Sequence, residues 1–351
     1  MTGASGKRSR TNDVLVAIAV TPRTRKSVLA LLVVAGSEHN QMNTIVATAC
    51  TAVLVFLFAV SFGALASRLH PLLDLLGQFL LPAVIAAAVI VPIALLAGRP
   101  TIAIAAIAAL ILNLAIAWPW LHEPAKTKAD GPRFKLLIFN VFVYNPRLDL
   151  VEKLVRDADA DIVVLFEVVP RVRSKLTALE RAYPYHFEGW PILRSDAWIL
   201  SRYPLTDVSA NLPSAKTPRS LAAARIAIDD RSLTLLAAHL ILPFPFKRLQ
   251  AQPEQADDLA DAVRSVPGTR LLVGDFNAAT WGASVAKQSE KTPLQALTGA
   301  GGTWPSFFPR HAGIPIDHIL ATPELALLSR KLMTVYGSDH RAVLAEIAFK
   351  E

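Results

Sequence analysis

Three long apolar runs follow one another in the first third of the chain. They cover residues 44–66, 75–98 and 101–121 and hold no charged side chain, and Arg99 lies between the second and the third. Each exceeds the roughly 18 apolar residues that mark a membrane-spanning helix. Buried core helices are the alternative, but they would show a polar face. We therefore expect three transmembrane helices within residues 44–121.

The segment before these runs, residues 1–43, is polar and carries six basic side chains. We expect it to be irregular and disordered. Its apolar stretch, residues 27–36, is too short to span a membrane and has no convincing cleavage site, so we do not expect a signal peptide. Both Met1 and Met42 fit as the start of the protein.

Three crossings would place the two ends of the chain on opposite sides of the membrane. The basic residues before the first run and Arg99 both favour a cytoplasmic N-terminus. Four basic residues after the third run oppose this, but long domains translocate largely regardless of charge. We expect a multi-pass protein of the cell (inner) membrane with an extracytoplasmic C-terminal domain.

Residues 122–132 form a polar linker with two prolines, and strand-like and helical patterns alternate after it. The predicted strands are 135–142, 162–168, 197–200, 222–228, 233–240, 271–274, 316–321 and 342–349, and the predicted helices are 148–158, 171–181 and 250–266. This order predicts an α/β domain over residues 133–351, with two packed sheets and helices outside.

Composition and charge exclude a dedicated nucleic-acid-binding protein and a disulfide-linked scaffold. The chain is 53% hydrophobic and has a net charge of +8, yet residues 124–351 hold 28 basic and 24 acidic side chains, so the domain lacks the basic stripe of a dedicated nucleic-acid binder. Cys50, the single cysteine, lies in the first apolar run, so no disulfide framework exists. The apolar runs hold almost no ionisable residue, which favours an anchor over a transport pathway.

Polar side chains end or begin most of the predicted strands. They are Asn140, Glu167, His239, Asp275, Asn277, Asp317, His318, Ser338, Asp339 and His340. Carboxylates, amides and histidines at one rim of a sheet can assemble a metal site and a proton-transfer site. Their hard oxygen atoms favour Mg²⁺, with Mn²⁺ as the alternative. Each residue alone fits a turn, a cap or a satisfied core side chain equally well.

Taken together and in this order, the motifs resemble the endonuclease/exonuclease/phosphatase superfamily. The matching segments are Phe139-Asn140-Val141, Leu165-Phe166-Glu167-Val168, Ile199-Leu200-Ser201-Arg202-Tyr203-Pro204, Ala238-His239-Leu240, Gly274-Asp275-Phe276-Asn277, Ile316-Asp317-His318-Ile319-Leu320 and Gly337-Ser338-Asp339-His340-Arg341. The resemblance implies a four-layered α/β sandwich of two mixed sheets, and hydrolysis of a phosphate ester by metal-assisted in-line attack of water.

The resemblance also implies roles for single residues. Asn140 and Glu167 look like metal ligands, and Asp339 looks like the remaining carboxylate near the metal. Asp275 looks like the residue that orients water, with Asn277 beside it. His340, with Asp317 as its partner, looks like the phosphate contact, and His239 like the histidine near the leaving group.

Two positions depart from the family pattern. Phe166 stands where a glutamine often precedes the metal-binding glutamate, and Phe142 stands where some nucleases carry an acidic residue. The second weakens a nuclease assignment built on abasic-site enzymes. Membrane tethering and the modest charge leave both extracytoplasmic nucleic acid and a phosphorylated lipid head group open as substrates. The sequence indicates no protein partner. A catalytically silent membrane-bound binding module is the alternative function.

The loops 243–248 and 303–311 should flank the site, and their aromatic and arginine side chains suit base stacking or a lipid interface equally.

Overall fold

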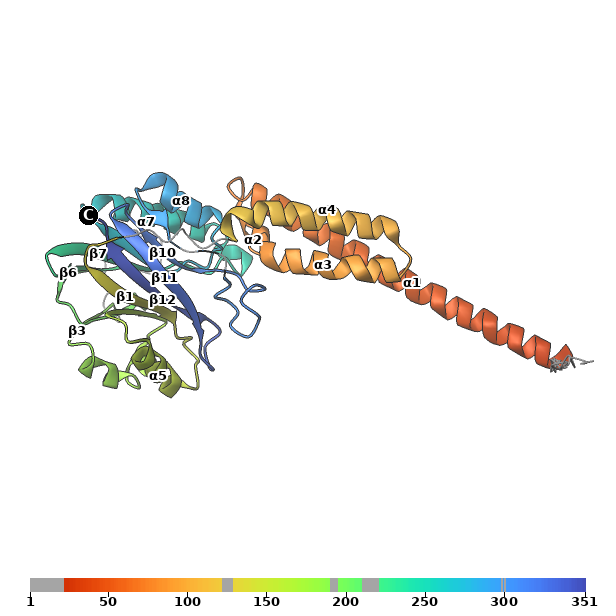
Figure 1. The fold of residues 1–351 in the computed structure, drawn as a ribbon, viewed down its shortest axis with the longest axis horizontal. Coiled ribbons are helices and arrows are strands. Elements are labelled where there is room, and N and C mark those ends of the chain that lie inside the picture. The colour runs from red at the N-terminus through yellow and green to blue at the C-terminus, as the bar shows by residue number, and fades with distance from the viewer. Residues whose placement is uncertain (1–21, 122–128, 190–194, 210–220, 298, 300) are drawn as a thin grey trace, which may run out of the picture.

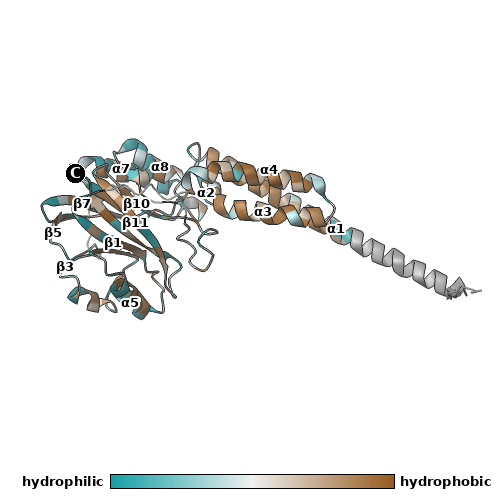
Figure 2. Cartoon of the chain, viewed as in Figure 1, coloured by the Kyte–Doolittle hydropathy of each residue, from teal (hydrophilic) through white to brown (hydrophobic). Residues whose placement is uncertain are grey.

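The computed structural model describes residues 22–121, 129–189, 195–209, 221–297, 299 and 301–351, with side chains described from residue 41 onward. Figure 1 shows a bundle of apolar helices that extends from one end of a mixed α/β domain. The helices are α1 (Pro22–Leu65), α2 (Pro71–Gly77), α3 (Leu80–Leu96) and α4 (Pro100–Ala117), followed by the short η1 (Trp118–Trp120). Figure 2 shows that their described residues are predominantly hydrophobic.

The bundle holds two helices that are long and apolar enough to cross a membrane. They are Gln41–Leu65 and Pro100–Trp120, and α2 with α3 is a third span only if the pair counts as one, because it bends by 51° at residues 78–79. The predicted second run, 75–98, is therefore broken near its start. The expected irregular segment also differs, because α1 begins at Pro22, while residues 1–21 lie outside the described residues.

Two six-stranded mixed sheets form the domain. The first has the order β11-β12-β1-β2-β4-β3 and the second β5-β6-β7-β8-β10-β9. The strands are β1 (Arg133–Asn140), β2 (Ile162–Phe166), β3 (Tyr185–Glu188), β4 (Trp198–Ser201), β5 (Leu205–Ser209), β6 (Ala222–Ile228), β7 (Arg231–His239), β8 (Arg270–Asp275), β9 (Gln295–Ala296), β10 (Asp317–Ala321), β11 (Leu325–Thr334) and β12 (Arg341–Phe349).

The predicted layers are confirmed. Alternate residues of both sheets, such as Leu136 and Leu235, face inward and form one core. On the outer face of the first sheet lie α5 (Leu148–Ala158), α6 (Pro170–Arg173) and η2 (Thr177–Arg181), and on that of the second lie α7 (Ala251–Ser265) and α8 (Ala283–Lys291), with η3 (Phe246–Arg248) before α7. Four layers result.

Some predicted elements differ in detail. The helix predicted over 171–181 is instead α6 and η2, because Leu176 between them has φ −113° and ψ 12°, outside the helical region. Its apolar residues still pack on the first sheet. The strand predicted over 162–168 ends at Phe166, because Glu167 turns the chain with φ 62°. The short or exposed elements β3, β5, β9, β11 and α8 carry weaker patterns and were not predicted.

Candidate active site

The candidate residues meet at one rim because of strand direction. β1 runs parallel to β2, and β7 runs parallel to β8, so the carboxyl ends of these strands share an edge. β10 and β12 run antiparallel to their neighbours and begin at this edge. Each strand therefore delivers the residue at its end or start: Asn140, Glu167, His239, Asp275, Asp317 and His340.

Backbone conformation at the rim is unusual at the functional positions. Glu167 and Asn277 have φ values of 62° and 47°, in the left-handed region that non-glycine residues seldom adopt. Gly274, just before Asp275, has φ 156°, and a Cβ there would lie 1.7 Å from the carbonyl oxygen of Ala238. Glycine is therefore required for β7 and β8 to approach this closely.

Asp275 is the hub of the site. It is buried, and its Oδ2 accepts a hydrogen bond from Asn140 Nδ2 at 3.0 Å. The same oxygen lies 3.5 Å from His239 Nε2 and 3.6 Å from His340 Nε2. Burial raises the pKa of Asp275, while the two imidazoles lower it and the Asp317 carboxylate raises it further. A carboxylate of raised pKa is a stronger proton acceptor than an ordinary aspartate.

His340 and Asp317 form a buried pair beside Asp275. His340 Nδ1 lies 2.9 Å from Asp317 Oδ2, and the His340 backbone N–H donates to Ser338 Oγ at 3.0 Å. Burial disfavours the charged imidazole, but Asp317, Asp275 and Asp339 outweigh burial and raise the pKa of His340 to about 10. This histidine is therefore held as a cation that can face an anionic phosphoryl group.

His239 has a carboxylate partner that the sequence reasoning missed. Its Nδ1 lies 2.8 Å from Asp196 Oδ2, and its Nε2 lies 3.3 Å from Asn277 Nδ2. Asp196 immediately precedes a predicted strand beside the Glu167 strand, a position that could have marked it. The imidazole also contacts the ring of Phe166 edge-on, with centroids 6.0 Å apart. The phenylalanine that departs from the family pattern thus packs against this histidine.

Asn140 and Glu167 are joined directly. Asn140 Nδ2 donates to Glu167 Oε1 at 3.0 Å, and Glu167 Oε2 accepts from the Val143 backbone N–H at 2.6 Å. Asn140 Oδ1 accepts from the Phe142 N–H at 3.0 Å. Asn140 is buried, whereas Glu167 is half-exposed, so the glutamate forms the solvent-facing side of the site.

Asp339 contacts the site from the turn before β12. Its Oδ2 accepts from the indole N–H of Trp304 at 3.0 Å, while its buried Oδ1 has no hydrogen-bond partner among the residues that the structure describes. A buried carboxylate oxygen left without a partner is costly unless a cation or a ligand donor satisfies it. Asn140 and Glu167, which contact each other, and Asp339 offer the hard oxygen atoms that a cation such as Mg²⁺ prefers.

Among the described residues, another grouping has ligand atoms close enough together to hold a metal ion. Single ligand atoms of Asp275, Asp317 and His340 lie within 4.8 Å of one another. We favour the oxygen set for the cation, because the imidazole of His340 is a cation at neutral pH and already occupies the space between these two carboxylates.

His318 is not part of this centre. It is buried, its Nε2 lies 2.7 Å from the Ala278 carbonyl oxygen, and burial lowers its pKa to about 4. It therefore supports the loop after Asn277 as a neutral side chain.

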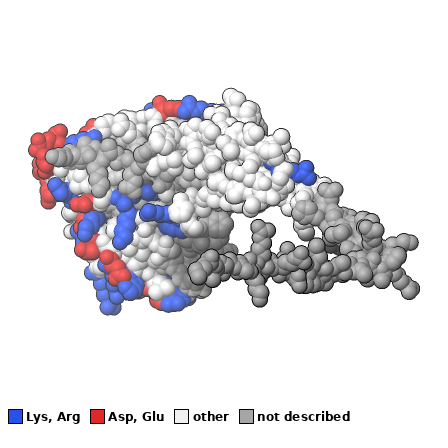
Figure 3. Space-filling view, turned by 45° about the vertical axis from the view of Figure 1, so that its right-hand side comes forward, with Lys and Arg blue, Asp and Glu red and all other residues white. Residues whose placement is uncertain are grey.

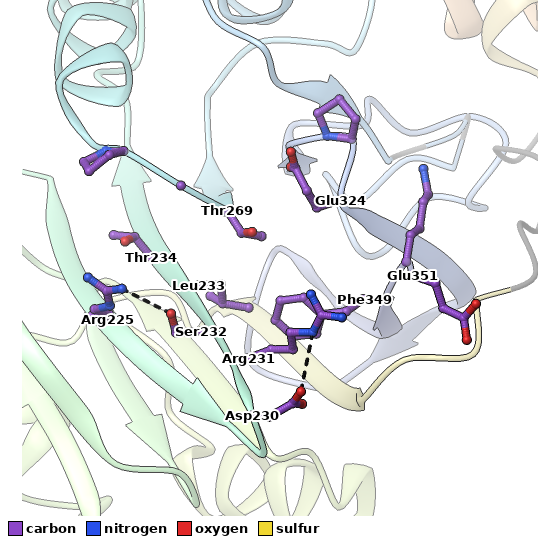
Figure 4. A pocket seen from close by; sticks show the side chains of 14 residues that line it. Arg225, Asp230, Arg231, Ser232, Leu233, Thr234, Thr269, Glu324, Phe349 and Glu351 are labelled. Atoms are coloured by element: carbon purple, nitrogen blue, oxygen red, sulfur yellow. Dashed lines mark hydrogen bonds and ion pairs between the residues drawn. The ribbon is translucent and has the colours of Figure 1, made fainter.

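A surface depression of about 600 Å³ lies at the opposite ends of the same strands. Figure 4 shows its lining, from the β6–β7 turn at Asp230 and Arg231 to Thr269, Glu324 and Phe349. Arg231 begins β7 and Phe349 ends β12, whereas His239 ends β7 and His340 precedes β12. The depression therefore lies away from the rim that carries the candidate residues and holds none of them.

Comparisons with known proteins agree with this geometry. The model of the Endonuclease/Exonuclease/phosphatase family matches residues 137–340. No curated protein matches the chain. Similar solved structures include an endonuclease/exonuclease/phosphatase from Beutenbergia cavernae, with 20% identity, a TM-score of 0.50 and coverage of 62% of this chain and 72% of that one. Another such protein, from Bacteroides vulgatus, has 17% identity, a TM-score of 0.52 and coverage of 62% and 99%. A humanized D. rerio TDP2 has 18% identity, a TM-score of 0.50 and coverage of 61% and 98%.

At these identities the solved structures establish a shared fold. The family match covers more than half of the chain and runs from β1 to His340, so it includes every candidate site residue. The chain therefore belongs to the endonuclease/exonuclease/phosphatase family.

Proposed function

We propose that this protein is a membrane-anchored, divalent-metal-dependent phosphoesterase that hydrolyses a phosphate ester by in-line attack of water. One observation carries the proposal: Asp275 Oδ2 lies within 3.6 Å of nitrogen atoms of Asn140, His239 and His340. These four residues come from the ends of four different strands. A single carboxylate surrounded by two imidazoles and an amide is costly to bury without a function.

The side chains divide the chemistry between them. Asp275 accepts a proton from the attacking water, and its raised pKa suits it to that role. His340, held as a cation by Asp317, and the Asn277 amide face the phosphoryl oxygens. His239, oriented by Asp196, protonates the leaving oxygen.

Asn140, Glu167 and Asp339 would hold the cation, with Mg²⁺ first and Mn²⁺ as the alternative. When bound, the cation supplies positive charge that neutralises the phosphoryl oxygens in the transition state. Independent of activity, Mg²⁺ should raise the unfolding temperature of the wild type, because a ligand that binds only the folded state stabilises it. Glu167→Gln should reduce this shift.

The test uses the full chain in detergent micelles with bis-p-nitrophenyl phosphate as substrate. We expect Mg²⁺-dependent release of p-nitrophenol that EDTA abolishes. Asp275→Asn keeps the shape but removes the base, and should lower kcat by roughly 10²–10³-fold or more. Asp261→Asn, at an exposed aspartate on α7 that pairs with Arg264, is the matched control and should keep the wild-type rate.

Two results would contradict the proposal. Equal rates in wild type and Asp275→Asn would show that the site does not catalyse the reaction. Absence of hydrolysis in every protein, with Mg²⁺ or Mn²⁺ present, would support the alternative of a silent binding module.

We further propose that the anchor crosses the cell (inner) membrane three times, which leaves the catalytic domain outside the cytoplasm. This requires α2 and α3 to act as one span, since two crossings would return the domain to the side of the membrane on which the N-terminus lies. Asp230→Cys, on the exposed β6–β7 turn, tests it, because Cys50 is buried in the bundle. A membrane-impermeant maleimide should label the variant in intact spheroplasts. Labelling only after lysis would place the domain inside.

A further inference from the structure

The catalytic centre lies against the ends of the apolar helices. Ile316, directly before Asp317, belongs to one apolar cluster with Leu80 and Ala117, which stand at the first turn of α3 and the last turn of α4. Trp304, which donates to Asp339, packs against the same cluster. Since adjacent Cα atoms are about 3.8 Å apart, Asp317 is one residue from this contact. The candidate active site therefore lies beside the domain-facing ends of α3 and α4.

Hydrogen bonds fix this arrangement. Gln78 Oε1 accepts from the Ala279 N–H at 2.5 Å, and the Gly77 carbonyl accepts from the Trp281 indole at 2.7 Å. Asp74 Oδ1 accepts from the Ala283 N–H at 2.9 Å, at the start of α8. All three acceptors lie on or beside α2, and all three donors lie in the segment that follows Asn277. The domain is thus held in one orientation relative to the helices.

The rim loops carry most of the exposed large apolar side chains of the domain. In the part of residues 129–351 that the structure describes, nine such side chains are exposed: Tyr144, Tyr185, Val208, Leu242, Phe244, Phe246, Phe307, Phe308 and Tyr336. All except Tyr185 and Val208 lie on loops that follow or precede catalytic strand ends. In Figure 1 the loops before α7 and before β10 lie on the side of the domain that adjoins the bundle.

The loop that carries the most exposed phenylalanine is tied to the site. Phe307 is 76% exposed, yet its neighbour Ser306 donates from its N–H to the Asp339 carbonyl at 2.7 Å and from its hydroxyl to the Ser338 carbonyl at 2.7 Å. Arg341 donates to the Ser306 carbonyl from the other side at 2.7 Å. The loop is anchored at its base and exposed at its tip, which is how a rigid apolar contact surface is built.

A cationic depression of about 490 Å³ lies at the seam between bundle and domain. Its lining consists of Leu81, Leu121, Gly301, Arg310, His311, Arg330, Lys331 and Leu332. Figure 3 shows Lys and Arg on the domain surface close to the bundle, which is uncharged over most of its length. Basic side chains beside apolar ones at this level suit an anionic head group with its acyl chains.

We infer that the mouth of the active site rests on the bilayer surface and that the substrate is the phosphodiester of a membrane lipid head group. The inference rests on the proposed function and names its substrate class. Exposed aromatic tips at a membrane boundary gain stability by inserting at the interface. The anchor keeps the bilayer within reach of them permanently. A nucleic acid would have to enter between these tips and the lipid, against a domain without a basic stripe.

The reaction balances with water alone. The water oxygen forms a bond to phosphorus while the bond from phosphorus to the leaving oxygen breaks. One water proton goes to Asp275, and the leaving oxygen receives a proton from His239. The products are an alcohol and a phosphate monoester, one of which keeps the acyl chains.

The experiment uses the full chain in vesicles of phosphatidylcholine, with and without phosphatidylglycerol, in Mg²⁺ buffer. Two rates are measured in each sample: release of water-soluble head-group product, and hydrolysis of added bis-p-nitrophenyl phosphate. We expect lipid hydrolysis in the wild type, faster where phosphatidylglycerol is present. In the double variant Phe307→Ser, Phe308→Ser the ratio of the lipid rate to the soluble-diester rate should fall about tenfold. Val208→Ser, exposed but away from the mouth, should leave both rates at the wild-type level.

The outcomes separate the two levels of inference. Hydrolysis of the soluble diester without any lipid product, or with cleavage of single-stranded DNA or RNA instead, overturns the lipid assignment and leaves the phosphoesterase intact. An unchanged rate ratio in the double variant overturns the contact between mouth and bilayer. If the wild-type protein hydrolyses neither the lipid nor the soluble diester, the proposed function itself is contradicted.

Discussion

Asp196→Asn is the most informative single change at the site. The carboxylate lies 2.8 Å from His239 Nδ1, and both side chains are largely buried, with 16% and 4% exposure. A charge-assisted hydrogen bond of this kind contributes about 1.5–3 kcal/mol. If that bond forms fully only when His239 must carry and release a proton, its loss should lower kcat by roughly 10–150-fold. Folding should persist, because asparagine matches the shape of aspartate.

The leaving group distinguishes proton transfer from a general loosening of the site. A p-nitrophenolate ion leaves without a proton, whereas an alkoxide needs one. Asp196→Asn should therefore depress hydrolysis of an alkyl phosphodiester by the full factor and hydrolysis of bis-p-nitrophenyl phosphate much less. The two kcat values are measured on the same preparation with saturating Mg²⁺. Equal losses on both substrates, or no loss on either, would refute the role assigned to His239.

Asp159→Asn is the matched control. Asp159 ends α5 with φ 45°, a conformation that asparagine tolerates well, and its carboxylate pairs with Arg202 at the surface. Exposed ion pairs contribute about 0–1 kcal/mol, so both activities should match the wild type.

Three further changes test other parts of the structure. Gly274→Ala should prevent folding, at a cost above about 4 kcal/mol, because the new Cβ would overlap the Ala238 carbonyl oxygen; circular dichroism and expression yield check this. Trp281→Phe removes the donor to the Gly77 carbonyl and should cost about 0.5–1.5 kcal/mol in urea unfolding, with faster amide exchange in the loop after Asn277. Burial holds the pKa of His318 at about 4, below the unfolded value of about 6.5, so its contribution is fully present above pH 6.5 and is lost as pH falls toward 4; His318→Gln should flatten stability over that window by on the order of 3 kcal/mol.

Much of the fold could be predicted because the buried strands consist of consecutive apolar residues. β2, β8 and β10 each hold a continuous run of apolar residues with polar residues at or next to its ends, which is typical of strands covered on both faces. The strands at the edges of the two sheets were harder to predict. β3 and β5 are largely exposed, so their sequences lack a strong pattern. Likewise, the turns α6 and η2 together bury the same residues that one helix would bury, so periodicity could not separate the two.

The site was predictable where motif and strand end coincide, and less so where partners come from elsewhere. Asp275 and His340 stand in motifs at strand ends, and the structure brings them together. Asp196 is a lone aspartate before a short strand, and only the antiparallel pairing of β2 with β4 places it beside His239. Trp304 is similarly remote, since a loop that returns from β9 brings its indole to Asp339. Such long-range partners have no local signature.

Hydropathy alone predicts that the apolar helices are a simple tether. The bend between α2 and α3 indicates that they also contact and support the domain. A straight second span of 75–98 would satisfy hydropathy better than a helix broken at Gln78. The break directs Gln78 and Asp74 toward the segment after Asn277, where Gln78 accepts the buried N–H of Ala279 and Asp74 accepts the partly buried N–H of Ala283. Unsatisfied buried donors cost about 1–3 kcal/mol each, so docking and bending stabilise each other. The segment after Asn277 therefore has two supports, the β8 strand behind it and the apolar helices beside it. A domain cut from its helices would keep the first support and lose the second.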